Sequence, residues 1–140
     1  MFINQISVFV ENSAGRLSEI TEILAREKID IRALSIADTT DFGILRLIVN
    51  RPDAAIEALK TAGITTKKTK VLAAQLADTP GSLHDILMIL NGIMVEYVYA
   101  FITRKEDDAY VILRVEDIDT AARLLTNGGV KLLSETDVFL

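Results

Sequence analysis

The chain repeats one turn, and this internal repeat constrains its fold more than any other feature. The stretch ENSAGRLSEI, residues 11–20, returns as ADTPGSLHDI, residues 77–86, and the glycines Gly15 and Gly81 lie 66 positions apart. Residues 6–71 and 72–137 are therefore two copies of one structural unit, which predicts two domains, residues 1–71 and 72–140. The same offset holds without a gap along both copies, as in the pairs Ile23 and Ile89, Leu24 and Leu90, Leu47 and Leu113, Ala55 and Ala121, and Gly63 and Gly129.

The first copy switches between the apolar period of strands and that of helices. Residues 3–10 alternate apolar and polar side chains, which predicts a half-buried strand. Residues 17–28 place their apolar side chains at helical spacing, after a turn in which Asn12 or Ser13 can serve as the N-cap. The remaining elements are two strands at 30–37 and 43–50, a helix that Pro52 opens and Gly63 closes, and a strand at 64–71.

This βαββαβ order is that of the ferredoxin-like architecture, an α+β fold in which an antiparallel sheet carries two helices on one face. No linker separates the copies, because the last strand of the first copy runs almost directly into the first strand of the second. The second copy repeats the order, with strands at 71–77, 93–103, 109–115 and 130–139 and helices at 81–91 and 118–127.

The second copy is the more apolar of the two. Its first helix begins with LHDILMILNGIM, residues 83–94, where Leu87 and Met88 replace the polar Thr21 and Glu22 of the first copy. Such a helix is expected to be buried on more than one side. The strand that follows is also apolar on both faces, so it requires a cover from the first copy, from another chain or from a ligand. We expect a homodimer, because aromatic and methionine-rich surfaces are typical of interface cores.

Composition excludes several classes of function. The net charge is −5 and the lysines cluster only at residues 67–70, so the chain lacks the basic footprint of a nucleic-acid-binding protein. No apolar run is long enough to span a membrane, and the first ten residues lack the basic start of a signal peptide, which predicts a cytoplasmic protein. The absence of cysteine excludes disulfides, thiolate nucleophiles and iron–sulfur clusters.

The sequence also lacks the residue patterns typical of catalysis and metal binding. His84 is the only histidine, so the imidazole clusters of zinc sites cannot form, and its place in the first turn of a helix predicts exposure to solvent. No glycine-rich phosphate-binding motif occurs, and the carboxylates of Asp117 and Asp119 are placed to cap a helix. We therefore expect a binding protein with no catalytic residue, no metal and no cofactor.

The repeated turn carries a resemblance to a known family. In the second copy, Asp78-Thr79-Pro80-Gly81-Ser82-Leu83 matches the pattern D-x-P-G-x-L between first strand and first helix, and in the first copy Asn12 and Ala14 replace the aspartate and the proline. Two βαββαβ units with such turns resemble a pair of ACT domains, which sense small molecules and commonly bind amino acids. The resemblance covers nearly the whole chain and implies a ligand at interfaces between paired domains. It also implies that Asn12 marks a binding site, since asparagine is common there in ligand-binding ACT domains.

The turn can bind a ligand for physical reasons as well. Glycine at the head of a helix allows another group to approach closely, and the N–H groups of residues 15–17 can cradle a carboxylate. The ammonium group of an amino acid requires oxygens, such as those of Asn12, Asp30 and Glu96. The alternative is that these residues only cap a helix and close a tight turn. The candidate ligand-binding residues are Asn12, Ser13, Ala14, Gly15, Arg16, Leu17, Asp30, Ile31, Asp78, Thr79, Pro80, Gly81, Ser82, Leu83, Glu96 and Tyr97.

Two rival functions are compatible with the same residues. Regulatory subunits of the acetolactate synthase type also resemble ACT proteins, and such a subunit acts in trans on a catalytic partner enzyme. An acylphosphatase-like hydrolase on the same fold needs an arginine near a catalytic asparagine, which Arg16 and Asn12 supply, but the turn lacks the long glycine-rich phosphate loop of those enzymes. We expect a regulatory protein that senses a small molecule, an amino acid in the first instance, and is not an enzyme.

Overall fold

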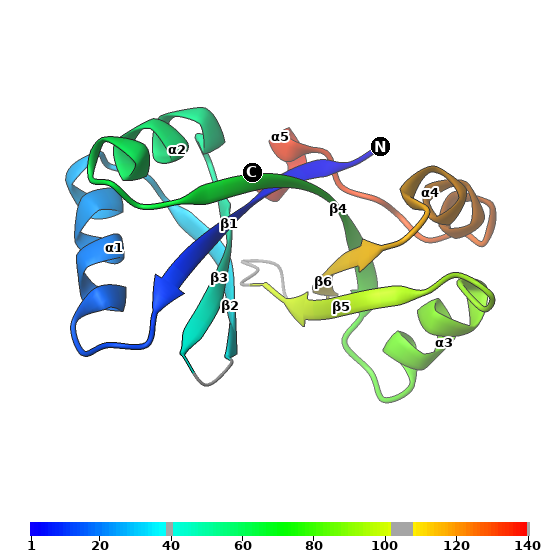
Figure 1. The fold of residues 1–140 in the computed structure, drawn as a ribbon. Helices are drawn as coiled ribbons and strands as arrows, with labels where there is room; N and C mark the ends of the chain where they lie inside the picture. The colour runs from blue at the N-terminus through cyan, green and yellow to red at the C-terminus, as the bar shows by residue number, and fades with distance from the viewer. Residues whose placement is uncertain (39–40, 102–107, 140) are drawn as a thin grey trace. The chain divides into compact units, whose positions relative to one another are not determined.

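The computed structural model describes residues 1–38, 41–101 and 108–139 (Figure 1). The chain forms two compact units. Residues Asn4–Thr69 make the first unit, and residues Met1–Ile3 together with Lys70–Leu140 make the second. The second unit is therefore discontinuous along the chain.

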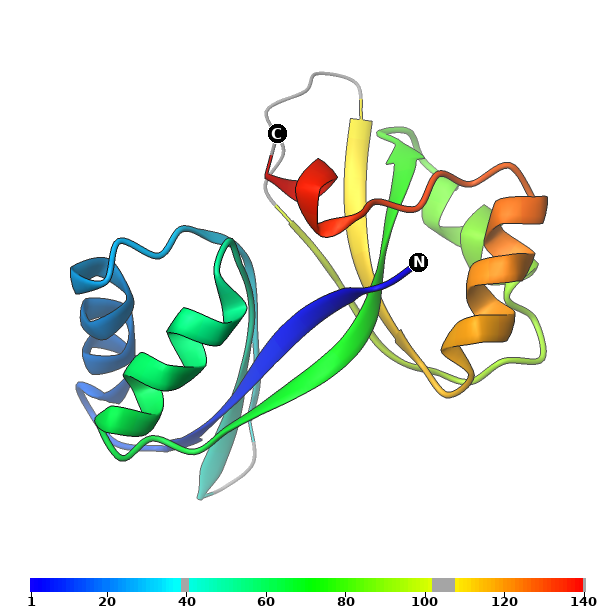
Figure 2. The same cartoon turned by 90° about the horizontal axis from the view of Figure 1, so that it is seen from above.

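The first unit has the predicted βαββαβ order. Its strands lie in the order β2-β3-β1-β4, and β3 is antiparallel to both of its neighbours. Both helices lie on the same side of these strands (Figure 2). The ferredoxin-like α+β fold is thus confirmed. The elements are β1 (Ile3–Glu11), α1 (Arg16–Arg26), β2 (Ile31–Asp38), β3 (Phe42–Val49), α2 (Pro52–Thr61) and β4 (Thr66–Ala77).

The second unit begins within β4, so one strand ends the first unit and starts the second, as the missing linker predicted. In the second unit β6 lies between β4 and β5 and is antiparallel to both. Residues 102 and 103 of the predicted strand 93–103 lie outside the described residues, as do residues 104–107 of the connection that follows it. The further elements are α3 (Ser82–Ile89), β5 (Val95–Ala100), β6 (Asp108–Val115), α4 (Ile118–Asn127) and α5 (Glu135–Val138).

The predicted last strand, residues 130–139, is wrong. Leu132 pairs with Ala74 of β4 through an isolated antiparallel bridge, and the Gln75 N–H donates to the carbonyl oxygen of Lys131 at 2.9 Å. By the offset of 66 positions, Leu132 corresponds to Thr66, the first residue of β4 in the first unit. The chain does not continue as a strand, however, and forms α5 instead.

A capping box explains why the strand ends. The Ser134 hydroxyl accepts the Asp137 N–H at 3.2 Å, and the Asp137 carboxylate accepts the Ser134 N–H at 3.0 Å. Two donors at the start of a helix are thereby satisfied reciprocally, which favours a helical turn over an extended chain. The sequence SETD therefore outweighs the strand-forming residues Val138 and Phe139.

Each unit buries its apolar side chains between its strands and its helices. Alternate strand residues point toward the helices because successive side chains of a strand lie on opposite faces. In the first unit this core consists of Ile6, Val8, Ile20, Ile23, Leu24, Ile29, Leu45, Leu47, Val49, Ala55, Leu59 and Ile64. In the second it consists of Leu72, Ala74, Ile86, Leu90, Val111, Leu113, Val115, Ala121 and Leu125.

The prediction that the first helix of the second copy is buried on more than one side is wrong for the single chain. Within α3 only Ile86 is buried, whereas Leu87 and Met88 are 36% and 57% exposed. Met94, just beyond the helix, is also exposed. The apolar excess of the second copy therefore lies at the surface of this chain.

A side-chain cap opens α4 at Asp117, in agreement with the acidic helix start predicted from the sequence. The pKa of the Asp117 carboxyl is lowered, first by a hydrogen bond with the Thr120 side chain and then by the Thr120 N–H, which donates to it at 3.1 Å.

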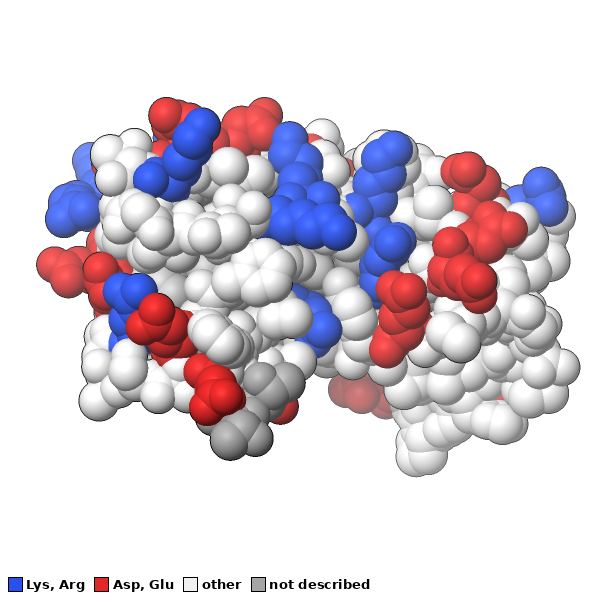
Figure 3. Space-filling view, in the orientation of Figure 1, with Lys and Arg blue, Asp and Glu red and all other residues white. Residues whose placement is uncertain are grey.

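Acidic and basic side chains are interspersed on the face drawn in Figure 3. In the part of the chain that the structure describes, no helix has both the length and the apolar character needed to cross a membrane.

Candidate functional site

The first candidate site lies at the turn between β1 and α1. Gly15 has φ of 86° and ψ of −8°, a left-handed conformation that favours glycine. The Ser13 N–H donates to the carbonyl oxygen of Glu11 at 2.8 Å, and the Arg16 N–H donates to that of Ser13 at 3.4 Å. These bonds fold residues 11–16 into a tight turn that leads directly into the helix.

The turn between β4 and α3 has the same backbone geometry. Gly81 has φ of 92° and ψ of −11°. The Thr79 N–H donates to the carbonyl oxygen of Ala77 at 2.9 Å, and the Ser82 N–H donates to that of Thr79 at 3.3 Å. Each bond is the counterpart of one in the first turn, so the repeat of sequence is also a repeat of backbone conformation.

Two predictions about the first turn are wrong. Neither Asn12 nor Ser13 caps α1, because the N-cap residue is Gly15 and no side chain bonds to the helix start. The predicted cradle of three N–H groups also loses a donor, since the Arg16 N–H bonds to Ser13. A Cβ added at Gly15 would meet no atom within 4 Å apart from those of its neighbours in the chain. Glycine is therefore required here by the backbone conformation, and a valine would be strained whatever space surrounds it.

A pocket of about 150 Å³ opens beside this turn. Its floor is apolar, because Leu45 is buried, and its walls include the exposed side chains of Leu17 and Ile36. A cavity of this volume holds about six heavy atoms, the size of benzene. Four predicted site residues line it, Asn12, Ser13, Arg16 and Leu17, together with Val10, Glu11, Ile36, Gly43 and Leu45.

The side chain of Asn12 is fixed at the mouth of this pocket. Its Nδ2 donates to Oδ1 of Asp38 at 2.8 Å, and its backbone N–H donates to the carbonyl oxygen of Asp41 at 3.2 Å. Because the amide nitrogen is turned to Asp38, the amide oxygen lies toward Gly43, 3.4 Å from where a Cβ of that residue would stand. The amide oxygen, which can accept a hydrogen bond, therefore lies beside Gly43, another residue that lines the pocket.

Arg16 supplies a positive charge at the same place. Its guanidinium donates to the Glu19 carboxylate at 2.8 Å, and both side chains are partly exposed. Such an ion pair contributes little stability, so a ligand carboxylate can compete with Glu19 for the guanidinium. Arg16 also lines a neighbouring hollow of about 180 Å³, whose other lining residues include Phe9, Phe42 and Ile64.

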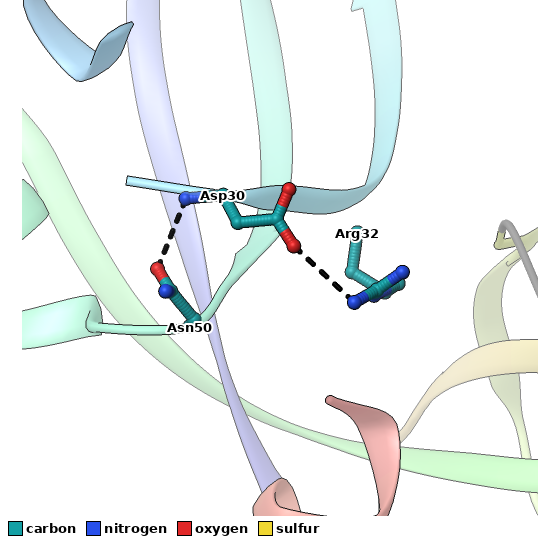
Figure 4. A network of polar contacts seen from close by, with 3 residues as sticks. All are labelled: Asp30, Arg32 and Asn50. Carbon is teal, nitrogen blue, oxygen red and sulfur yellow. Dashed lines mark hydrogen bonds and ion pairs between the residues drawn. The ribbon is translucent and has the colours of Figure 1, made fainter. Parts of the chain in front are cut away.

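Asp30 and Ile31 lie far from this pocket. The Asp30 N–H donates to the Asn50 side chain at 3.0 Å, and its carboxylate accepts from the Arg32 guanidinium at 3.2 Å (Figure 4). Ile31 begins β2, whereas Asp38, which bonds to Asn12, ends it, so the two places are roughly 23 Å apart. Within the first unit, the predicted site residues thus form two separate groups.

In the second turn the predicted residues mainly contact one another or solvent. The hydroxyl groups of Thr79 and Ser82 form a hydrogen bond of 2.8 Å, and the Ser82 side chain is partly buried. No cation occupies the position that corresponds to Arg16, because that position is Ser82. The exposed members of the turn are Asp78, Thr79, Pro80, Gly81 and Leu83.

Glu96 and Tyr97, the last of the predicted site residues, lie at the start of β5. The Glu96 carboxylate pairs with the Arg114 guanidinium at 3.2 Å. Tyr97 stacks on Tyr99, with ring centroids 6.3 Å apart. Both residues contact side chains of their own sheet, and Glu96 is exposed.

Several residues at the pocket were not predicted from the sequence. Asp38, which orients Asn12, is the last residue of β2, and Gly43, which leaves room beside it, lies near the start of β3. Gly43 comes close to the turn because the pairing of β1 with β3 places it opposite Val10. That register cannot be read from apolar alternation alone.

A third hollow, of about 560 Å³, lies along α1 and α2 and contains none of the predicted site residues. Its lining includes Ala54, Ala58 and Ala62 of α2 or its end, with Arg26 and Glu57 beside them. Among the described residues, no group of three or more histidine, aspartate or glutamate side chains is arranged to hold a metal ion. The pocket at Asn12 is thus the place where predicted residues, fixed polar groups and an apolar cavity coincide.

Comparison with known proteins gives a consistent result. A family model for the ACT domain pair matches residues 1–139. The crystal structure of protein BT0572 from Bacteroides thetaiotaomicron is similar, with 38% sequence identity and a TM-score of 0.92 over 99% of this chain and 96% of that one. No relative was found among curated proteins.

More distant structures share the fold. The ligand-free regulatory subunit of aspartate kinase from Thermus thermophilus has 16% identity and a TM-score of 0.62, over 89% of this chain and 90% of that one. Aspartokinase III of E. coli, in complex with lysine and aspartate, has 14% identity and a TM-score of 0.51, over 90% of this chain and 31% of that one. At these identities the likeness concerns the fold alone.

Proposed function

The chain belongs to the ACT domain pair family, and from this premise we propose that it is a non-catalytic regulatory protein that binds an amino acid in the pocket at Asn12. The observation that carries the proposal is the combination of an apolar floor with fixed polar groups of both signs at the mouth. An amino acid requires this combination, because it joins an anion, a cation and a side chain at one carbon atom.

Each group of the ligand has a partner in this proposal. The ligand carboxylate pairs with the Arg16 guanidinium near the start of α1, where the helix dipole also favours an anion. The ligand ammonium donates to Oδ1 of Asn12, with the Asp38 carboxylate close by. The ligand side chain points toward Leu45 at the floor. No step of chemistry is included, since the chain has no cysteine and its single histidine, His84, lies on α3.

A screen for thermal stabilisation tests this function. We expect one amino acid, or a small group of related ones, to raise the melting temperature when each of the twenty is added separately. At a concentration about 100 times its Kd, a ligand stabilises the folded state by about 2.7 kcal/mol, which corresponds to roughly 5 to 10 °C for a chain of this size. The matching 2-oxo acids lack the ammonium group and should stabilise much less. Equal stabilisation by a 2-oxo acid, or none by any amino acid, would contradict the proposal.

We also propose that the protein is a homodimer. The apolar side chains that α3 and its surroundings expose, including Leu87, Met88 and Met94, are better accommodated in an interface than in water. Light scattering at micromolar concentration should give a mass about twice the 15.4 kDa of one chain. Charged substitutions at Met88 and Met94 should lower that mass, and a wild-type mass of one chain would refute the dimer.

The regulated target in this proposal is a partner enzyme. The relative from Thermus thermophilus is named a regulatory subunit, and the acetolactate synthase type of regulatory subunit is the alternative that the sequence left open. A subunit of the acetolactate synthase type acts on a separate catalytic chain. Purification of the tagged protein from its host, followed by mass spectrometry of the proteins that copurify, distinguishes a dedicated enzyme partner from a protein that works alone.

A further inference from the structure

The two units can be compared residue by residue because their strand registers agree. In the first unit, Val10 of β1 lies opposite Gly43 of β3. In the second, Leu76 of β4 lies opposite Ala109 of β6. Both pairs differ by the same 66 positions as the glycines of the two turns. Each position that lines the Asn12 pocket therefore has a counterpart in the second unit, except that the counterpart of Ile36, residue 102, lies outside the described residues.

The apolar side chains of the pocket have apolar counterparts in the second unit, whereas the missing side chain at Gly43 and the positive charge of Arg16 are not retained there. Leu17 and Leu45 correspond to Leu83 and Val111, which are also apolar. Gly43 corresponds to Ala109, which carries a methyl group where the first unit has none. A Cβ at Gly43 would stand 3.4 Å from the Asn12 amide oxygen, and both residues line the pocket. The second unit thus already carries, at this position, the methyl group that the first unit lacks.

The polar groups change in the same direction. Arg16 corresponds to Ser82, so the helix start of the second unit carries no cation at that position, and the counterpart of Asp38, Arg104, lies outside the described residues. Asn12 corresponds to Asp78, so a carboxylate replaces the amide and repels an anion. The Ser82 hydroxyl bonds instead to Thr79 within the turn. The backbone of the second turn is thus kept without the amide of Asn12 and the guanidinium of Arg16, the two groups proposed to hold the amino acid.

We infer that each chain binds a single amino acid, in the first unit, and that Gly43 is the residue whose missing side chain makes this unit competent to bind. This inference rests on the proposed function. It assigns to the second turn a structural role, namely to lead β4 into α3 through Gly81. It also makes Gly43 a determinant of which unit binds the amino acid. The backbone does not require glycine at this position, because Gly43 has no left-handed conformation and a methyl group there would be in ordinary contact.

Equilibrium dialysis measures the number of sites directly. The native chain is dialysed against an equimolar mixture of the twenty amino acids, and the amino acids retained are identified and counted by mass spectrometry. We expect one mole retained per mole of chain at saturation. Two moles per chain would overturn the inference while the proposed function stands, whereas retention of none would overturn both.

The Gly43→Ala variant tests the cause. The added methyl group fits without displacing the backbone, so melting temperature and circular dichroism should stay close to those of the native chain. We expect affinity for the retained amino acid to fall at least about tenfold, because the methyl group takes up space in the pocket. Unchanged affinity in the folded variant would overturn the role of Gly43. If the variant does not fold, the count of sites in the native chain still decides how many units bind.

Discussion

Replacing Leu47 with alanine is expected to lower the free energy of unfolding by about 2 to 5 kcal/mol, the largest effect on stability that we expect from one substitution. Leu47 lies in β3, the strand between β1 and β2, and only 1% of its side chain is exposed. It belongs to the core that joins these strands to α1 and α2. Truncation removes apolar contacts and leaves a cavity that the surrounding strands cannot fill.

Leu34→Ala is the matched control for this variant. Leu34 lies directly opposite Leu47 in the pairing of β2 with β3, but it is 53% exposed. Its truncation should change the free energy of unfolding by no more than about 0.5 kcal/mol. Urea denaturation measures both variants, provided that the dependence on urea concentration stays constant. Similar losses in the two variants would show that Leu47 does not lie in the core described here.

Asn12→Ala should weaken binding of the amino acid by about 5- to 150-fold, which is about 1 to 3 kcal/mol. The substitution removes the amide oxygen that faces the pocket and leaves the ligand ammonium without that acceptor. It also releases Asp38, whose carboxylate accepts the Asn12 amide at 2.8 Å. Calorimetric titration with the amino acid that gives the greatest thermal stabilisation measures the change.

The control for this variant is Asn127→Ala. Asn127 is an exposed asparagine at the end of α4, in the other unit, so the same chemical change is made away from the pocket. Its affinity should equal that of the native chain. If Asn12→Ala also binds with native affinity, then the first turn serves only to lead β1 into α1, and the ligand must bind elsewhere.

Most helices and strands could be predicted from the sequence because the chain contains the same structural unit twice. Each segment was represented twice, so the period of Ile20, Ile23 and Leu24 in one helix was supported by that of Ile86, Ile89 and Leu90 in the other. The prediction failed where the copies diverge. Residues 130–139 do not form the predicted strand, because Ser134 and Asp137 form a capping box that their counterparts in the first copy, Lys68 and Val71, cannot form.

The candidate site was predicted less completely, for a different physical reason. The turn residues Asn12 and Arg16 are adjacent in sequence, and a local pattern reveals them. Asp38 bonds to Asn12 from 26 residues away, and Gly43 lies beside Asn12 only because β1 pairs with β3. Such neighbours depend on register and hairpin geometry, which residue composition does not encode.

The discontinuity of the second unit has a consequence for how this protein can be recombined with others. A single genetic crossover between residues 69 and 70 would transfer most of the second unit but leave Met1–Ile3 behind, including Ile3, which is 1% exposed. The first unit, Asn4–Thr69, is by contrast one uninterrupted insert between two pieces of the second. The unit proposed to bind the amino acid is thus a contiguous segment that two crossovers can exchange, and we expect a chimera built at these junctions to take its ligand specificity from the inserted unit.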